Sequence, residues 1–192
     1  MRRATDELGG IRVFTARRFV DERGSLLQSY TQSGLEALGI GAVFKQAIQS
    51  RSKRGVIRGL HFQWNPPQGK LIRCVTGAIL DVVVDIRVAS PTLGDHAAIE
   101  LNEANDSTLW VPPGFAHGFM ALADDSIVLY ECTAEWTPET EGGILWSDAG
   151  IGIEWPELHP TVSDKDRKLP TLTQWLADPR SAHLHLSPSA GS

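Results

Sequence analysis

The chain contains 192 residues with a formal net charge of −5 at pH 7, a length that predicts one domain, 1–192, with a core over about residues 11–170 and a frayed tail at 187–192. The acidic balance argues against nucleic acid or an anionic membrane as a partner, because both are bound through clustered Lys and Arg. The first ten residues lack the apolar core of a secretion signal, and the longest apolar run, 78–86, is too short to cross a bilayer, so we expect a cytoplasmic protein.

Short runs of β-branched and aromatic residues, separated by Gly, Pro, Asn and Asp, follow one another along most of the chain, and none has the period of a long helix. The turn 21–24 is expected to join the first two runs, and short helices are expected at 35–38 and 172–177. Even strand spacing predicts an all-β jelly roll or small barrel, and the irregular sequence after Pro138 predicts a cap. The expected strands cover residues 11–14, 25–30, 43–48, 56–63, 70–76, 78–87, 96–101, 107–111, 117–121 and 127–133.

Arg58 and His61 interrupt the apolar strand expected over 56–63, and Lys70 begins the next one. In a strand of strict two-residue period the first two side chains point to opposite faces, so a bulge near Gly59, or a pocket at the strand's end, is needed to bring them together. A cation and a titratable imidazole in one pocket indicate an anionic substrate and a transferred proton. The alternative is a solvent-exposed arginine on an edge strand and a histidine satisfied in the core.

A second histidine, His117, follows a tight Pro/Gly turn and stands between two aromatic residues in the segment 112–119. Such a turn can place a ligand or a base at the mouth of a β-barrel. Metal-binding jelly rolls supply a His-x-His pair and a glutamate soon after it, but here Gln63 follows His61 and Lys70 stands near the place of the glutamate. Because a lysine opposes a divalent cation, we predict no metal and no cofactor.

Two carboxylates, Asp81 and Asp85, lie four residues apart in an aliphatic strand and therefore on one face. Burying a carboxylate is costly unless it is paired, so a histidine or lysine of the same cavity is the expected partner. A strand end or a structural ion pair stays open as the alternative, above all for Asp85. Cys74 and Cys132 also fall within strand patterns, and we expect buried, reduced thiols rather than a disulfide.

Taken alone, Tyr130 in its strand is most simply a core residue. The charged segment 162–166, which follows a proline, is most simply a solvated turn. Together with the features above they complete an ordered series of motifs that resembles the dTDP-4-dehydrorhamnose 3,5-epimerase family over about residues 19–166. The resemblance implies a cupin-type double-stranded β-helix, or jelly roll, with an irregular C-terminal cap and short helices. The motifs are RGLHFQ at 58–63, QGKLIR at 68–73, DVVVDIR at 81–87, SPTLG at 90–94, PGFAHGF at 113–119, EGGI at 141–144 and SDKD at 163–166.

The family's chemistry is epimerisation at C3, C5 or both of a dTDP-4-keto-6-deoxyhexose in deoxysugar biosynthesis, without metal or nicotinamide. The resemblance implies that His61 is the general base, oriented by Asp166, and that Tyr130 is the acid on the opposite face of the sugar. Lys70 would lie near the C4 oxygen and stabilise the enolate. Further substrate-binding positions implied by the resemblance are Arg23 and Arg58 at the diphosphate, His117, Asp81, Glu141 and Gln46 in the pocket, and Phe19 and Trp136 near the thymine.

The sequence departs from the family pattern in two segments and at one aromatic residue. Ile48 and Gln49 replace a common asparagine and histidine, Gln28 replaces a usual glutamate, and Trp136 replaces a tyrosine. Because Ile48 cannot form the hydrogen bonds of an asparagine, the chain is expected to act on a different 4-keto sugar or to invert one centre only.

Two other functions are weighed against the epimerase. One is a metal-dependent cupin oxygenase or isomerase, which bound metal would identify. The other is a catalytically inactive, sugar-nucleotide-binding cupin, against which the presence of His61, Tyr130 and Asp166 argues. The resemblance also implies a homodimer, and the amino-terminal strands read as edge strands that could join the partner's sheet.

Overall fold

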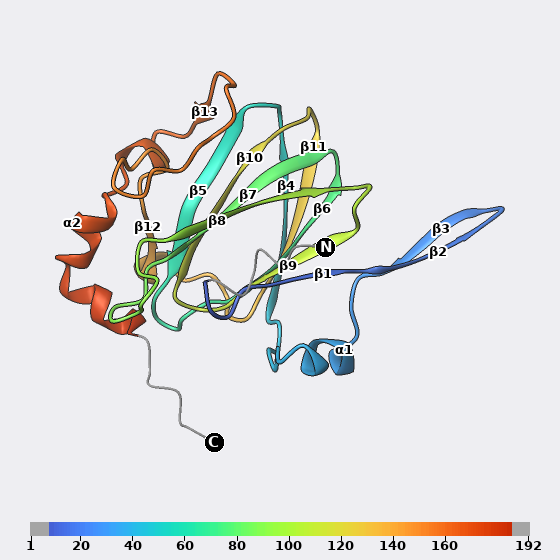
Figure 1. The fold of residues 1–192 in the computed structure, drawn as a ribbon, viewed down its shortest axis with the longest axis horizontal. Coiled ribbons are helices and arrows are strands. Elements are labelled where there is room, and N and C mark those ends of the chain that lie inside the picture. Colours follow the sequence, from blue (N-terminus) through green and yellow to red (C-terminus); the bar gives the residue numbers. More distant parts are fainter. Residues whose placement is uncertain (1–7, 186–192) are drawn as a thin grey trace.

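The computed structural model describes residues 8–185 as two facing β-sheets, with a hairpin projecting on one side and an irregular cap on the other (Figure 1). The first sheet is built from β1 (Arg12–Thr15), β4 (Gln46–Ser52), β6 (Lys70–Thr76), β9 (Ser107–Val111) and β11 (Ser126–Cys132). The second sheet is built from β5 (Val56–Gln63), β7 (Ala78–Asp85), β8 (His96–Asn102), β10 (Phe115–Ala121), β12 (Glu141–Gly143) and β13 (Thr161–Val162).

The strand orders are β1-β9-β6-β11-β4 in the first sheet and β12-β5-β10-β7-β8 in the second, with β13 beside β5. Every pairing in the two sheets is antiparallel except that of β13 with β5. Most neighbours in space are not neighbours in sequence, as in a jelly roll. The predicted all-β fold is confirmed.

The main core lies between the sheets, where alternate side chains of both meet. Ile72 of β6 and Phe119 of β10 are almost completely buried there. On β7, Val83 faces this core, whereas Val82 and Val84 face the cap on the other side. A strand covered on both faces needs apolar residues at nearly every position, which explains its nearly continuous aliphatic sequence. Cys74 and Cys132 are buried free thiols, as predicted.

The amino-terminal region differs from the expectation in one respect. The turn at 21–24 joins β2 (Arg17–Asp21) to β3 (Gly24–Gln28), whereas we expected it to join the first predicted strand to the second. β1 instead enters the first sheet. The hairpin β2–β3 projects from the sheets (Figure 1), and its side chains are almost all exposed. A strand with no buried face shows no alternation of polarity, so β2 carries no sequence signal.

Two short helices lie at the expected places. α1 (Gln32–Ala37) begins three residues before the expected turn, because Thr31 caps it by accepting a hydrogen bond from the Gly34 backbone. The cap contains η1 (Pro138–Thr140), η2 (Asp166–Lys168), α2 (Leu172–Leu176) and η3 (Pro179–Leu184).

The cap packs on the outer face of the second sheet. Trp175 of α2 lies edge-on against Phe62 of β5, with ring centroids 4.7 Å apart. Within residues 8–185, none of the helices is long and apolar enough to cross a membrane. The predicted frayed tail, 187–192, lies outside the described residues.

Candidate active site

A cavity of about 570 Å³ opens between the two sheets, with walls from β4, β6 and β11 on one side and from β5, β10, β12 and β13 on the other. Its size suits a small-molecule ligand. Polar and charged side chains line it together with apolar ones. The lining residues are Ile48, Ser50, Val56, Ile57, Arg58, His61, Gln68, Lys70, His117, Phe119, Tyr130, Cys132, Glu141, Thr161, Val162, Ser163, Lys165 and Asp166.

A bulge in β5 brings Arg58 and His61 to the same cavity. His117 of β10 pairs with His61, but Phe119, two residues on, pairs with Arg58, so β5 contains one residue more than its partner. Gly59 makes the bulge possible: its φ is +124°, and a Cβ there would lie 2.6 Å from the Cα of Gly118. The bulge predicted near Gly59 is confirmed.

His61 and Asp166 form a hydrogen-bonded pair at the cavity wall, with 2.7 Å between His61 Nε2 and Asp166 Oδ1. The Gly59 backbone N–H also donates to this carboxylate, and Ser163 Oγ accepts from the Asp166 backbone N–H. Burial alone would raise the pKa of Asp166, but the hydrogen bond and the charge of His61 outweigh it, and the pKa is lowered. The carboxylate therefore stays ionised beside a histidine that is 27% exposed.

A second pair, His117 and Asp81, lies deeper, with 2.8 Å between His117 Nε2 and Asp81 Oδ2 and with both side chains buried. Burial raises the pKa of Asp81 against the opposing effect of His117. Asp81 Oδ1 has no hydrogen-bond partner among the described residues. Lys70 lines the cavity nearby and donates to the His61 carbonyl at 3.3 Å. Burial lowers the pKa of Lys70, and the acidic groups around it, Asp81 among them, oppose this change.

Tyr130 reaches the cavity from β11, on the sheet that faces His61. Its hydroxyl lies 3.2 Å from Ser50 Oγ of β4. Burial raises the pKa of the phenol, so it remains protonated at neutral pH. Ser50 is not among the predicted site residues. The signal that could have identified it is the two-residue period from Gln46 along β4, which puts Ile48 and Ser50 on the cavity face.

Five predicted binding residues are not among those that line the cavity of this chain: Phe19, Arg23, Gln46, Asp81 and Trp136. Phe19 and Arg23 lie on the hairpin β2–β3, where Arg23 pairs with Asp21 and is 85% exposed. Trp136 follows β11 and is 52% exposed. Gln46 is bonded to the Trp136 backbone.

The departures at Ile48 and Gln49 fall on opposite sides of β4. Ile48 pairs with Tyr130 in register and lines the cavity. Gln49 pairs with Leu129 and is exposed on the outer face of the sheet. Only the first of the two replacements therefore changes the cavity wall.

Asp85, unlike Asp81, is part of a structural cluster. Its carboxylate accepts from the Arg87 guanidinium and from the Ser90 and Thr92 hydroxyls. Burial would raise the pKa of Asp85, but these hydrogen bonds outweigh it and lower the pKa. The structural ion pair left open for Asp85 is thus the arrangement observed.

In the described part of the chain, no group of three or more His, Cys, Asp or Glu side chains is arranged to hold a metal ion. Gln63, at the second position of the His-x-His pattern, is buried and bonded to backbone groups instead. The metal-dependent alternative thus finds no ligand set within residues 8–185.

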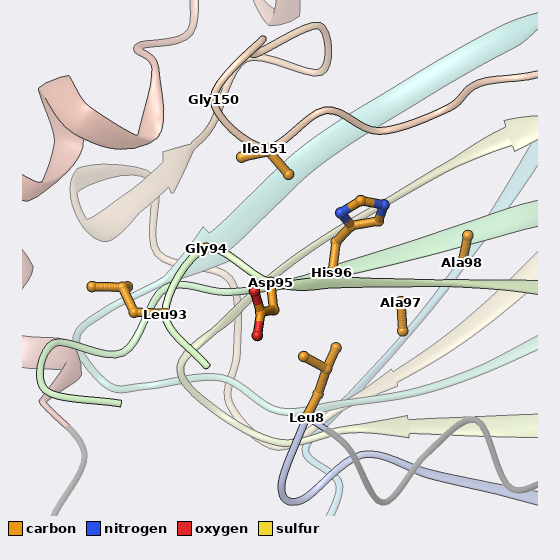
Figure 2. A pocket seen from close by; sticks show the side chains of 9 residues that line it. All are labelled: Leu8, Leu93, Gly94, Asp95, His96, Ala97, Ala98, Gly150 and Ile151. Atoms are coloured by element: carbon orange, nitrogen blue, oxygen red, sulfur yellow. The ribbon is translucent and has the colours of Figure 1, made fainter. Parts of the chain in front are cut away.

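A separate hollow of about 640 Å³ lies beside β8 (Figure 2). Figure 2 shows the His96 ring directed toward Ile151 of the cap, with Leu8 and Ala97 on the other side. None of the predicted site residues lines this hollow. Within residues 8–185, its histidine has no paired carboxylate of the kind found at His61 or His117.

The fold and the cavity define a jelly-roll protein of the cupin type with a polar small-molecule site between its sheets. The sequence profile of the dTDP-4-dehydrorhamnose 3,5-epimerase family matches residues 5–174. The dTDP-4-dehydrorhamnose 3,5-epimerase of Salmonella typhimurium is 47% identical over 161 residues, covering 82% of this chain and 88% of the relative. The chain belongs to this family and is an epimerase.

Two solved structures show the range of the family. A dTDP-6-deoxy-D-glucose-3,5-epimerase from Legionella pneumophila, in complex with dTDP-4-keto-L-rhamnose, superposes with a TM-score of 0.89 at 35% identity, over 96% of this chain and 97% of that one. A 3'-monoepimerase from Streptomyces bikiniensis, in complex with dTDP-quinovose, superposes with a TM-score of 0.84 at 30% identity, over 90% of each chain. The shared fold therefore serves enzymes that invert two centres and enzymes that invert one.

Proposed function

We propose that the protein epimerises C3, C5 or both of a dTDP-4-keto-6-deoxyhexose in deoxysugar biosynthesis. The observation that carries this proposal is that a histidine–aspartate pair and a protonated tyrosine, His61–Asp166 and Tyr130, come to one cavity from facing sheets. Inversion of a carbon centre needs a base on one side of the ring and an acid on the other.

His61 is the base. Asp166 accepts from Nε2–H and so selects the tautomer with a free lone pair on Nδ1. The hydrogen on the carbon beside the C4 ketone leaves as a proton to Nδ1, and its electron pair forms the enolate with charge on the C4 oxygen. The Asp166 carboxylate stabilises the resulting imidazolium.

Lys70 stabilises the enolate. Its ammonium group is a donor in a largely desolvated part of the cavity, where an ionic hydrogen bond to the C4 oxygen is strengthened by the low dielectric. His117, in contact with Asp81 rather than solvent, closes the same end of the cavity.

Tyr130 is the acid. Its hydroxyl transfers a proton to the carbon from the face opposite His61, which inverts the centre and leaves a phenolate on Tyr130. The phenolate is neutralised by a proton from solvent or by the proton that His61 has taken up. The apolar surroundings that raise the pKa of Tyr130 keep it protonated until the enolate is formed.

Arg58 binds the diphosphate. Its guanidinium lines the cavity and is held by Ser52 Oγ at 3.0 Å and by the Arg51 carbonyl at 3.2 Å. A guanidinium fixed in this way presents its remaining N–H groups to phosphate oxygens without further loss of side-chain entropy.

We further propose a homodimer in which each hairpin β2–β3 supplies Phe19 and Arg23 to the partner's cavity. The hairpin exposes Phe19, Val20 and Leu26 and makes no strand pairing with either sheet of its own chain. An exposed apolar hairpin of this kind is normally covered in the working assembly.

Mixing two inactive variants tests the dimer. Arg23→Ala and His61→Asn, co-expressed, form heterodimers in which one cavity contains both His61 and Arg23. Recovered activity in the mixture supports the shared site. Heterodimers that form but show no activity refute it. Sedimentation of the wild-type protein as a monomer would refute the dimer itself.

The test of the reaction is incubation with dTDP-4-keto-6-deoxyglucose in deuterated water, followed by NMR. Exchange of a hydrogen at C3 or C5 together with inversion supports the proposed function. Binding of dTDP without exchange would instead support the non-catalytic cupin, and stoichiometric Fe or Zn required for turnover would support the metal-dependent one.

Ile48 bears on how many centres are inverted. It stands beside Tyr130 on the acid side of the cavity, with no hydrogen bond to offer the sugar. We propose that this apolar position restricts inversion to one centre or adapts the site to a different 4-keto sugar. In the same deuterium experiment, C3 and C5 exchanging at similar rates would refute the restriction.

The two free thiols suit the reducing cytoplasm that we propose as the location of the protein.

A further inference from the structure

The hairpin β2–β3 is joined to the rest of its own chain through the side chain of one arginine. Arg18 of β2 donates through Nε to Asp106 Oδ2 at 2.8 Å, and its Nη2 donates to the other oxygen of the same carboxylate. Asp106 lies in the connection between β8 and β9. Within residues 8–185, no other side chain of β2 or β3 forms a hydrogen bond to a residue outside the hairpin. This bidentate contact is therefore the main polar restraint on the direction of the hairpin.

Arg18 also joins the two strands of the hairpin to each other. Its Nη1 donates to Ser25 Oγ of β3 at 2.7 Å, so one guanidinium contacts β2, β3 and Asp106. Arg18 and Ser25 lie on one face of the hairpin, and Phe19, the next residue along β2, lies on the other. The face that Arg18 binds to its own chain is thus opposite to the face that presents Phe19.

Asp106 interacts with a second arginine, which holds the other end of the hairpin. Its backbone carbonyl accepts from the Ala16 N–H at 2.9 Å, just before β2. The hydrogen bond from Arg18 lowers the pKa of Asp106 against the effect of burial, and the charge of Arg73 on β6 adds to the lowering. Arg73 Nη1 donates to Ser29 Oγ at 2.9 Å, directly after β3. The carboxylate thus separates two guanidinium charges that would otherwise repel each other.

We propose that Arg18 and Asp106 are positioning residues whose ion pair sets the direction of the hairpin β2–β3, and with it the placement of Phe19 and Arg23 in the partner's cavity. The inference rests on the proposed function, in which each hairpin reaches a second copy of the chain. A hairpin whose side chains are almost all exposed has little packing to fix its direction. Fixing the hairpin before the substrate arrives lowers the entropy that binding costs.

Steady-state kinetics with dTDP-4-keto-6-deoxyglucose give the first test. Arg18→Met removes the charge and the donors, and the KM should rise about fivefold. The kcat should change little, because the groups that move protons lie on the sheets. Asp106→Asn should act similarly, since asparagine also tolerates the φ of +50° at this position. The double variant should be no worse than either single one, because both changes break one contact. A multiplied effect in the double variant would overturn the proposal.

Two further variants separate this contact from a general effect of charge. Arg18→Lys keeps the charge but cannot form the bidentate contact, so its KM should lie between those of the wild type and Arg18→Met. Arg180→Met is the matched control, because it removes an exposed ion pair with Asp178 on the cap. Its KM should equal that of the wild type. A rise as large as that of Arg18→Met would assign the effect to surface charge and overturn the proposal.

Mixed dimers show whether Arg18 acts on the partner's cavity or on its own. A wild-type chain and a His61→Asn chain carry different affinity tags, so the purified heterodimer has one active cavity, and the His61→Asn chain supplies the hairpin to it. Arg18→Met added to the His61→Asn chain should raise the KM about fivefold. Arg18→Met placed in the other chain should leave the KM at the wild-type value. The reverse pattern would show that Arg18 acts on its own cavity and would overturn the proposal.

Failure of this inference and failure of the proposed function give different results. Arg23→Ala, added to the His61→Asn chain of the same heterodimer, is the reference. If Arg23→Ala raises the KM there and Arg18→Met does not, the ion pair is refuted as a positioning device while the shared site stands. If neither raises it, the shared site is refuted together with this inference, while deuterium exchange by the wild-type enzyme still supports epimerisation. Thermal unfolding identifies any variant that misfolds, and Arg18→Lys replaces Arg18→Met if the latter is destabilised.

Discussion

The two histidine–aspartate pairs of the cavity have nearly the same geometry and very different surroundings. The nitrogen–oxygen distance is 2.7 Å for His61–Asp166 and 2.8 Å for His117–Asp81. The His61 side chain is 27% exposed, whereas that of His117 is 3% exposed. The pKa of Asp166 is lowered and that of Asp81 is raised.

The difference shows that a hydrogen-bonded pair does not by itself identify a base. The Asp166 carboxylate also accepts from the Gly59 backbone N–H, and hydrogen bonding by Ser163 adds to the lowering of its pKa, so it remains an anion that can stabilise an imidazolium as the proton arrives. Asp81 is fully buried, and its Oδ1 has no partner within residues 8–185, so additional charge beside it is costly. The outer pair can exchange protons with a ligand, and the inner pair is suited to holding His117 in place.

The largest effect is expected from His61→Asn. Removal of the base should lower epimerisation by about 10⁴-fold and abolish deuterium exchange at the inverted carbon. Binding of dTDP should persist, since the diphosphate contacts remain. The matched control is His96→Asn, in the separate hollow of Figure 2. Exchange at the wild-type rate in His61→Asn would contradict the assignment of the base.

Tyr130→Phe should have the next largest effect, about 10³-fold on inversion. His61 is intact in this variant, so deuterium should still enter the substrate with retention of configuration. The ratio of exchange to inversion, measured by NMR, therefore rises. Tyr30→Phe is the control, because the Tyr30 hydroxyl bonds Glu131 outside the cavity. An unchanged ratio in Tyr130→Phe would assign the acid to another group.

Asp166→Asn should lower turnover by about 10²-fold, because the amide cannot stabilise the imidazolium and can favour the wrong tautomer. The substitution should also change how stability depends on pH. The folded-state pKa of Asp166 is lowered, so its contribution is present above about pH 4, the unfolded value, and is lost as the pH falls through the folded value.

The wild-type protein should accordingly lose more thermal stability between pH 6 and pH 3 than Asp166→Asn does. Asp164→Asn, at an exposed position of the same loop, is the control. If the thermal stability of Asp166→Asn and of the wild type fell by the same amount between pH 6 and pH 3, the pair would contribute nothing to folding stability.

The smallest catalytic effect is expected from Asp81→Asn. The amide oxygen can still accept from His117, so turnover should fall only about tenfold and stability should change by about 1 kcal/mol. Steady-state kinetics and urea unfolding measure the two quantities. A loss as large as that of His61→Asn would mean that the inner pair takes part in proton transfer, and the contrast between the pairs would be removed.

Most of the fold could be predicted from the sequence, and the structure brings His61, Lys70, Tyr130 and Asp166, which the resemblance groups together, to one cavity. The strands at 56–63 and 70–76 were predicted to the residue, because β-branched runs end there at clear turn signals. The bulge near Gly59 could be predicted because Arg58 and His61 would point to opposite faces of a regular strand and can share a site only if the strand is irregular.

The rest depended on contacts that local sequence does not encode. β2 was missed because both of its faces are exposed. Ser50 meets Tyr130 only through the register of β4 against β11, which no local pattern specifies. The glutamine side chains that bond the backbone of residues 134–137 come from β4, from β5 and from the loop before β6, and a neutral amide has no sequence signature of the backbone group it will bond.

The close approach of Gly59 and Gly118 has a consequence for how this enzyme can diversify. No side chain fits at either glycine, so the wall that carries His61 cannot be remodelled without separating β5 from β10. The opposite wall has no such constraint, since Ile48 is partly exposed on a strand that forms the edge of its sheet. New substrate preferences are therefore expected to arise by substitution along β4, while the wall that carries His61 stays as it is.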